Sequence, residues 1–326
     1  MRAIVITEPG GPEVLQIQEV ADPAPSGDEV LIRVRAFGVN HAETHMRKGE
    51  WPEWTPISGI EAVGEVVEDP SGRLAEGTKV LTIMGGLGRF RNGSYAEYTA
   101  AAATNVAAID SGLDWTELAA IPESFATAWI ALTDNLGLHA GHSLLVRGAT
   151  SALGQAAVNI ASDLGAQVIA TTRREDRAEL LRSLGARDVV IETGAIAEQV
   201  RALVPGGVDR ALDLVGNSVL RDSLKAVRVR GRLCQAGFLG GLGPVEDFLP
   251  VFDMPSGVQF SFFGSFEVGS EAYPLSAIPF QEIVAKVESG VYTAKPSRVF
   301  TFDQIAQAHQ VMEASQAAGK LVIAGV

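Results

Sequence analysis

The segment Gly148–Gly154, with the sequence GATSALG, has the residue types and spacing of a turn that binds phosphate. Gly148 follows an apolar run and can make a tight turn, while Gly154 allows the next helix to approach that run closely. The residues between them are mostly small, so their backbone N–H groups can meet pyrophosphate oxygens, and the Ser151 hydroxyl can donate to the same oxygens. The alternative is an ordinary strand–turn–helix with glycines at its turn. The strand–loop–helix context favours a dinucleotide-binding loop, formed by Gly148, Ala149, Thr150, Ser151, Ala152 and Leu153.

The next predicted strand, AQVIATT at 166–172, ends in residues that distinguish between the two nicotinamide cofactors. A site that prefers NAD places Asp or Glu about 20 residues past the glycines, where it accepts a hydrogen bond from the ribose 2′-hydroxyl. Here Thr172 is followed by Arg173 and Arg174, with Arg177 one helical turn further on. Guanidinium groups match the charge and oxygens of a 2′-phosphate, so these residues predict NADPH rather than NADH. The alternative, a solvated helix start, is disfavoured because the first turn of a helix prefers anions.

The periodicity along the chain predicts an α/β protein with two domains. Short apolar segments separated by Gly and Pro predict a β-rich domain over residues 1–120. Short apolar strands then alternate with amphipathic helices, which predicts a Rossmann-type, doubly wound parallel sheet over 121–265. The tail, 266–326, contains helices expected near 275–289 and 303–317 and a last strand, and it is expected to return to the first domain. The stretch 239–257 is expected to be a loop.

The composition limits the classes of function. At 326 residues and 47% hydrophobic residues, the chain can form two cores, and a net charge of −13 argues against a surface that binds nucleic acid. Cys234 is the only cysteine, which excludes an internal disulfide and fits a reducing compartment. The N-terminus reaches Glu8 and Pro9 before an apolar signal region can form, and no apolar run approaches the length of a membrane span. A cytosolic protein is expected.

Several further motifs occur in a characteristic order. They are GGPEVLQ at 10–16, GVNHAETHMRKG at 38–49, SGIEAVGEVVE at 58–68, GSYAEY at 93–98, TAWIAL at 127–132, DLVGNSVLRDSL at 213–224 and GKLVIAGV at 319–326. In this order and spacing, and together with the glycine loop, they make the chain resemble the zinc-independent branch of the medium-chain dehydrogenase/reductase superfamily, the quinone oxidoreductase group. The resemblance implies a GroES-like first domain completed by the tail, a Rossmann domain that binds NADPH, and a homodimer or homotetramer.

The resemblance also implies roles for individual residues. Asn40 and Thr127 would approach the nicotinamide, Ala152 and Leu153 the pyrophosphate, and Arg173 and Arg177 the 2′-phosphate. The rest of the cofactor would be lined by Val215, Gly237, Phe238, Phe262, Phe263, Gly264 and Ser265. The chain departs from the family in three places. Ser151 and Ala152 stand where glycines are usual, and His45 stands where a tyrosine is common. Glu192 stands where some members contact the adenosine phosphate, and a carboxylate there would oppose a phosphate unless it points away.

No metal site is expected. Zinc-using relatives place a cysteine where Asn40 stands and a histidine where Ile60 stands, and one cysteine cannot form a structural zinc lobe. Without a Lewis acid, the expected acceptor of the hydride is already electron-poor, either a quinone or an α,β-unsaturated carbonyl compound. Asn40 is a candidate for holding cofactor or substrate, or it simply caps the following helix. His45 is a candidate proton donor, or a histidine without a chemical role.

Three aromatic residues are further candidates for contact with the substrate. Tyr95 is a second candidate donor, although a structural role is expected for it, and Trp51 and Trp54 either stack on a flat quinone or belong to a surface loop. The leading hypothesis is an NADPH-dependent quinone or enone reductase. The alternatives are an enoyl-thioester reductase, which uses the same hydride chemistry, and a non-catalytic NADPH-binding protein, for example a redox sensor or an RNA-associated protein. The acidic composition disfavours the RNA-associated version.

Overall fold

The computed structural model describes all 326 residues, and these divide into two compact units. Unit 1 consists of Met1–Ala126 and Phe266–Val326, and unit 2 is Thr127–Ser265. The sequence placed the first boundary at residue 120, whereas the division falls inside helix α3 (Pro122–Ile130). No helix in the chain combines the length and the apolar character needed to cross a membrane.

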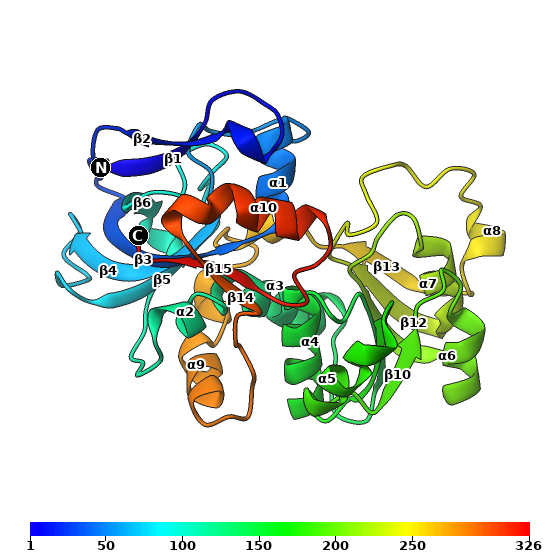
Figure 1. Cartoon of the computed structure of the whole chain (residues 1–326). Helices are drawn as coiled ribbons and strands as arrows, with labels where there is room; N and C mark the ends of the chain where they lie inside the picture. The colour runs from blue at the N-terminus through cyan, green and yellow to red at the C-terminus, as the bar shows by residue number, and fades with distance from the viewer. The chain divides into compact units, whose positions relative to one another are not determined.

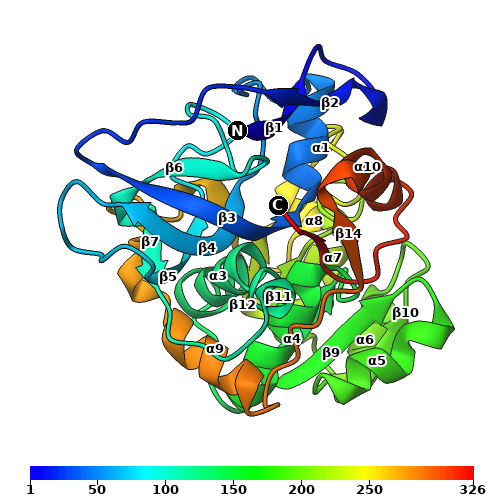
Figure 2. The same ribbon diagram turned by 60° about the vertical axis from the view of Figure 1, so that its left-hand side comes forward.

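Unit 1 is built on a seven-stranded sheet. Its order is β14-β15-β3-β4-β5-β7, with β6 also paired to β3, and the hairpin of β1 and β2 forms a separate two-stranded sheet (Figures 1 and 2). The last strand, β15, pairs antiparallel with β3, so the C-terminal tail does return to the N-terminal part of the chain. The strands are β1 (Arg2–Ile6), β2 (Leu15–Glu19), β3 (Glu29–Val39), β4 (Glu61–Glu68), β5 (Lys79–Ile83), β6 (Tyr98–Ala102), β7 (Val106–Ala108), β14 (Arg298–Thr301) and β15 (Leu321–Ala324).

An aromatic cluster forms the centre of the unit 1 core. The rings of Phe37 and Tyr95 stack with centroids 4.7 Å apart, and Phe302 meets Phe37 edge-on at 6.5 Å. The Tyr95 hydroxyl lies 3.1 Å from Nε2 of His309, which burial keeps neutral by lowering its pKa to about 3. These contacts join β3 to the tail. The helices of unit 1 are α1 (His41–Lys48), α2 (Trp115–Leu118), the start of α3, α9 (Phe280–Glu288) and α10 (Ile305–Glu313).

Unit 2 is the predicted doubly wound sheet. Six parallel strands occur in the order β10-β9-β8-β11-β12-β13, and in Figure 1 α4 and α5 lie on one side of the sheet with α6 and α7 on the other. This strand order is that of the Rossmann fold, so the fold prediction is confirmed. The elements are β8 (Ser143–Arg147), α4 (Ala152–Asp163), β9 (Gln167–Thr172), α5 (Ala178–Ser183), β10 (Asp188–Ile191), α6 (Ala197–Leu203), β11 (Val208–Asp213), α7 (Leu220–Ala226), β12 (Val227–Gln235), α8 (Pro250–Asp253) and β13 (Gln259–Phe262).

Three elements differ in extent from the expectation. The helix expected near 275–289 is a 3₁₀ turn, Leu275–Ala277, followed by α9, because Pro279 disfavours helical conformation in the residue before it. The helix expected near 303–317 ends earlier, with α10 at Glu313. The stretch expected to be a loop contains the single turn of α8. None of these differences changes the strand order.

Candidate functional site

The loop between β8 and α4 has the geometry that its glycines predict. Gly148 has a φ of +87°, which is the left-handed conformation that favours glycine. A Cβ added at Gly154 would lie 2.5 Å from the Gly148 carbonyl oxygen and 2.6 Å from Cα of Ala149, so only glycine permits this approach of α4 to the loop. Ser151 has a φ of −69° and therefore fits without strain at a position where the resemblance implies glycine.

The Ser151 hydroxyl has a different role from the one expected. It accepts a hydrogen bond from the backbone N–H of Gly154 at 3.0 Å and donates its proton to the carbonyl oxygen of Gly148 at 2.9 Å. Ser151 therefore caps α4 rather than offering its proton to a phosphate. The N–H groups of Ala152 and Leu153 belong to the first turn of α4, where no intrahelical acceptor exists, so they are the donors that suit an anion. The loop fits the diphosphate of a dinucleotide.

The end of β9 presents two arginines that have no ion-pair partner within the chain. Arg174 is paired with Asp176, with Nε 2.9 Å from Oδ1, and its backbone N–H donates to the Thr172 hydroxyl at 3.1 Å. Arg173 is exposed and Arg177 is half-buried. Of the three arginines predicted to meet a 2′-phosphate, Arg173 and Arg177 are thus available, and Arg174 is engaged by its neighbour.

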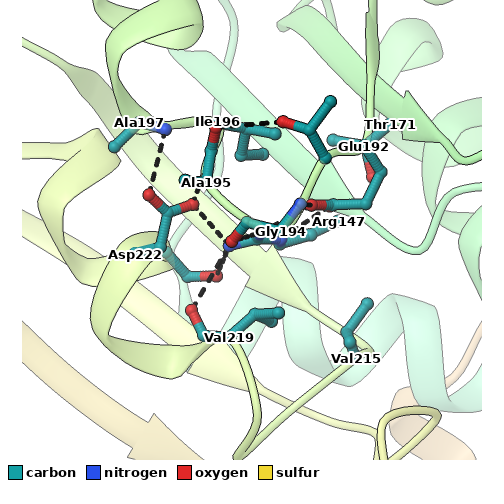
Figure 3. Close-up of polar contacts among 12 residues, drawn as sticks. Arg147, Thr171, Glu192, Gly194, Ala195, Ile196, Ala197, Val215, Val219 and Asp222 are labelled. Atoms are coloured by element: carbon teal, nitrogen blue, oxygen red, sulfur yellow. Dashed lines mark hydrogen bonds and ion pairs between the residues drawn. The ribbon is translucent and has the colours of Figure 1, made fainter.

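A fully buried arginine lies beside this region, and the sequence analysis missed it. Arg147, the last residue of β8, donates from Nε to Oε2 of Glu192 at 2.8 Å and from Nη2 to Oε1 at 2.7 Å (Figure 3). Its Nη1 donates to Oδ2 of Asp222 and to Oγ of Ser223, both at 2.9 Å. An arginine that ends an apolar strand was the available signal, because a buried guanidinium requires partners. The Glu192 charge that would oppose a phosphate is therefore compensated.

The remaining predicted cofactor residues of unit 2 gather where β11, β12 and β13 end. Asp213, the last residue of β11, accepts from the N–H of Val215 at 2.9 Å. A Cβ at Gly237 would lie 2.6 Å from the Leu214 carbonyl oxygen, which again requires glycine. The structure thereby brings together, at the carboxyl edge of the sheet, Val215, Gly237, Phe238, Phe262, Phe263 and Gly264, with the Phe238 and Phe262 rings 5.6 Å apart. Thr127 is buried on α3.

In unit 1, Asn40 belongs to a buried polar cluster. Its Nδ2 donates to Oε1 of Glu61 at 2.9 Å and to Oε1 of Glu43 at 3.3 Å, while its Oδ1 accepts from Nζ of Lys320 at 2.6 Å. Its backbone N–H donates to Oε2 of Glu43 at 2.8 Å, which closes the start of α1. The side-chain amide is thus already engaged by Glu61, Glu43 and Lys320 within unit 1.

The charges in this cluster are strongly coupled. Burial and the neighbouring Glu61 raise the pKa of Glu43 to about 8. Burial alone would lower the pKa of Lys320, but Glu61, with which it is ion-paired, and other carboxylates hold it above its ordinary value. One ammonium group thereby holds two buried carboxyl groups beside Asn40, and its charge compensates one of them.

The two candidate proton donors have different surroundings. Nδ1 of His45 lies 2.6 Å from Oε2 of Glu50, which orients the ring of this partly exposed residue. Tyr95 is fully buried against His309, and burial raises its pKa well above its ordinary value, which favours the structural role over proton donation.

Trp51 and Trp54 do not form a pair. The Arg89 guanidinium lies 5.9 Å from the Trp51 ring centroid and also contacts Phe90 and Phe266, each at 5.1 Å. Trp54 packs against the core of unit 1. Only Trp51 remains a candidate for contact with a flat acceptor.

The comparisons with known proteins agree with this geometry. "Alcohol dehydrogenase GroES-like domain" matches residues 26–111, and "Zinc-binding dehydrogenase" matches residues 152–282. No three or more His, Cys, Asp or Glu side chains gather so that they could hold a metal ion. A GroES-like unit and a Rossmann unit in one chain, the latter with a loop that fits a dinucleotide, define the medium-chain dehydrogenase/reductase class.

The quinone oxidoreductase of Lama guanicoe is 32% identical to the chain over 341 residues, which covers 99% of the chain and 97% of the relative. The chain belongs to the quinone oxidoreductase group of this superfamily, as the motifs predicted, and is an oxidoreductase. Among solved structures, mycobacterial Rv1454c complexed with NADPH has a TM-score of 0.89 at 27% identity, covering 99% of this chain and 100% of that one. An NAD-dependent alcohol dehydrogenase has a TM-score of 0.85 at 29% identity, covering 100% of both.

Proposed function

We propose that the protein is a zinc-independent, NADPH-dependent reductase that transfers hydride to a quinone or an α,β-unsaturated carbonyl compound. The observation that carries the proposal is the combination of the β8–α4 loop with Arg173 and Arg177 at the end of the next strand. The loop offers N–H donors to a diphosphate, and the two arginines offer unpaired positive charge to a 2′-phosphate. The resemblance to Rv1454c, described as complexed with NADPH, supports the same cofactor.

The absence of zinc ligands supports the choice of acceptor. Asn40 and Ile60 stand where zinc-using relatives place a cysteine and a histidine, and the oxygen of Asn40 is taken by Lys320. Without a metal to polarise a simple ketone, the acceptor must itself be electron-poor. Quinones and conjugated carbonyl compounds meet this requirement.

Residues of this chain would bind and orient the cofactor and would protonate the reduced acceptor. The amides of Ala152 and Leu153 would hold the diphosphate, and Arg173 and Arg177 would hold the 2′-phosphate. When bound, the nicotinamide supplies the hydride. A reduced quinone or enone anion then needs a proton, and we assign its donation to Nε2 of a doubly protonated His45, whose Nδ1–H stays hydrogen-bonded to Glu50 and which the step leaves as the neutral ring.

A substrate panel tests the proposal. Purified protein is incubated with NADPH and a series of quinones, enones, enoyl-thioesters and simple ketones, and the loss of NADPH absorbance is followed. Turnover of quinones or enones, with none of simple ketones, is expected. Turnover restricted to enoyl-thioesters would replace this function with the enoyl-thioester reductase alternative. Tight NADPH binding without turnover of any compound would indicate a non-catalytic NADPH-binding protein.

A thiol-based redox sensor is disfavoured by the only cysteine. Cys234 is fully buried on β12, and burial raises its pKa to about 11. The thiolate, which is the reactive form, is therefore scarce near neutral pH.

We further propose that the protein is a homo-oligomer. Strand β13 ends the sheet of unit 2 and has no neighbour on its outer side. Phe260 on this strand is 42% exposed, and Val251 and Phe252 on α8 are 80% and 77% exposed. Pairing of β13 with a second copy would bury apolar surface and satisfy the open edge. Light scattering after gel filtration should give a dimer or tetramer, and Phe260→Lys should shift it toward the monomer. A wild-type monomer would contradict the proposal.

A further inference from the structure

We propose that Arg147 is a positioning residue that sets the cofactor preference, because it holds the Glu192 carboxylate and so leaves Arg173 free for the 2′-phosphate. The inference rests on the proposed NADPH dependence. Arg147 makes no direct contact with the N–H donors of the dinucleotide loop or with Arg173 and Arg177. It is the last residue of β8, the strand that leads into the loop.

Glu192 lies next to the predicted 2′-phosphate subsite. Strands β9 and β10 are parallel neighbours, with Ile191 opposite Thr172, and the N–H of Glu192 donates to the Thr172 carbonyl oxygen at 2.8 Å. The residue that follows Thr172 is Arg173. A carboxylate at this point can accept from a ribose 2′-hydroxyl, pair with Arg173, or repel a 2′-phosphate, and each of these would favour NADH.

Arg147 prevents all three. Its guanidinium binds the Glu192 carboxylate with both Nε and Nη2, and the N–H of Gly194 donates to the same carboxylate at 2.9 Å (Figure 3). The Arg147 side chain is completely buried and that of Glu192 is 11% exposed, so the fork geometry is fixed by the surrounding protein. The carboxylate is therefore held on Arg147 and the N–H of Gly194.

Arg173 also acts on the charge of Glu192. Burial alone would raise the pKa of Glu192, but the hydrogen bonds and charge of Arg147 hold it below its ordinary value, with a smaller contribution from Arg173. Arg173 is thus close enough for its charge to act on Glu192. If Arg147 were neutral, Arg173 would be the remaining cation whose charge acts on this carboxylate, and it would interact with Glu192 instead of with the cofactor.

The same guanidinium also has a purely structural contact, which provides a control. Asp222 accepts from Nη1 and, through its two oxygens, from the N–H groups of Ile196 and Ala197 at the start of α6. In Figure 3 this carboxylate lies on a different side of Arg147 from Glu192. Asp222→Asn therefore perturbs the cluster without releasing Glu192.

The experiment measures dissociation constants for NADPH and NADH, by fluorescence titration of the full-length protein without acceptor. Arg147→Met should lower the NADPH-over-NADH preference by about fivefold, the factor expected when the partly exposed charge pair between Arg173 and the 2′-phosphate is lost. Arg147→Met/Glu192→Gln should restore the preference, and Asp222→Asn should leave it within twofold of wild type. A preference unchanged in Arg147→Met, or not restored in the double variant, would overturn the inference.

The single variant Glu192→Gln gives an independent test should Arg147→Met fail to fold. Because Arg147 already compensates Glu192, removing the charge should change the cofactor preference by less than twofold. A rise of tenfold would show that Glu192 acts on the phosphate despite Arg147, and would overturn the inference while leaving the NADPH preference itself intact. A wild type without any preference for NADPH would instead overturn the proposed function, and this inference with it.

Discussion

Gly154→Ala tests the close approach of α4 to the dinucleotide loop. The new Cβ would lie 2.5 Å from the Gly148 carbonyl oxygen and 2.6 Å from Cα of Ala149, both backbone atoms that cannot rotate away. To reach ordinary contact, α4 must retreat by about 1 Å. Overpacking of this kind lowers the free energy of unfolding by about 1–3 kcal/mol. The better helix propensity of alanine offsets up to about 1 kcal/mol of this loss. We expect a net loss of up to about 2 kcal/mol and a fall in Tm of up to about 5 °C.

The same shift moves the N–H groups of Ala152 and Leu153 away from the proposed position of the diphosphate. Loss of one hydrogen bond to a charged group costs about 1.5–3 kcal/mol, so the Kd for NADPH should rise about 10- to 100-fold. Thermal unfolding and fluorescence titration of Gly154→Ala measure both effects. Gly243→Ala is the matched control, because a Cβ there would meet no atom within 4 Å. Wild-type stability and affinity in Gly154→Ala would refute the reasoning.

Three further predictions concern charge and stability. Burial alone would raise the pKa of Asp209, but hydrogen bonds from the N–H and hydroxyl of Ser143 hold it at about 2, below its ordinary 3.8. The ionised Asp209 carboxylate therefore stabilises the protein above pH 4, and this contribution is lost as the pH falls toward 2. In urea unfolding, Asp209→Asn should lower the free energy of unfolding by about 1 kcal/mol at pH 7, after allowance for solvent screening. The loss should become progressively smaller below pH 4. Lys320→Met leaves Glu43 and Glu61 without their cation and should cost about 3–5 kcal/mol in the same assay, with Lys320→Arg closer to wild type. The raised pKa of Glu43, about 8, means that the folded state binds this proton more tightly than the unfolded chain, so its contribution to stability should fall as the pH rises from 5 to 8. Equal stabilities of Lys320→Met and wild type would contradict this view of the cluster.

Local patterns predicted the parts of the molecule that depend on neighbouring residues. The alternation of apolar strands and amphipathic helices predicted the Rossmann sheet, and the glycine spacing predicted the turn at Gly148 and the close packing at Gly154. Residue types at the end of β9 predicted the exposed arginines. In each case the relevant contacts lie within a few residues along the chain, or follow from the order of the strands.

The missed features depend on contacts between distant residues. Arg147 meets Glu192 and Asp222 across separations of 45 and 75 residues, and Lys320 meets Asn40 across 280. No periodicity in the sequence indicates which carboxylate a buried arginine will find. The capping role of Ser151 was missed for a different reason, since its hydroxyl could serve either its own helix or a ligand, and only the three-dimensional structure shows that its proton points to Gly148.

The affinity for NADPH and NADH, measured in wild type and in Arg173→Ala/Arg177→Ala, tests the central claim most directly. Arg174→Ala is the matched control, because Arg174 is already paired with Asp176. The account predicts that wild type binds NADPH more tightly than NADH and that the double variant loses at least tenfold in NADPH affinity. The NADH affinity of the double variant, and both affinities of Arg174→Ala, should change by less than twofold. A wild type that prefers NADH, or a double variant that loses both cofactors equally, would contradict it.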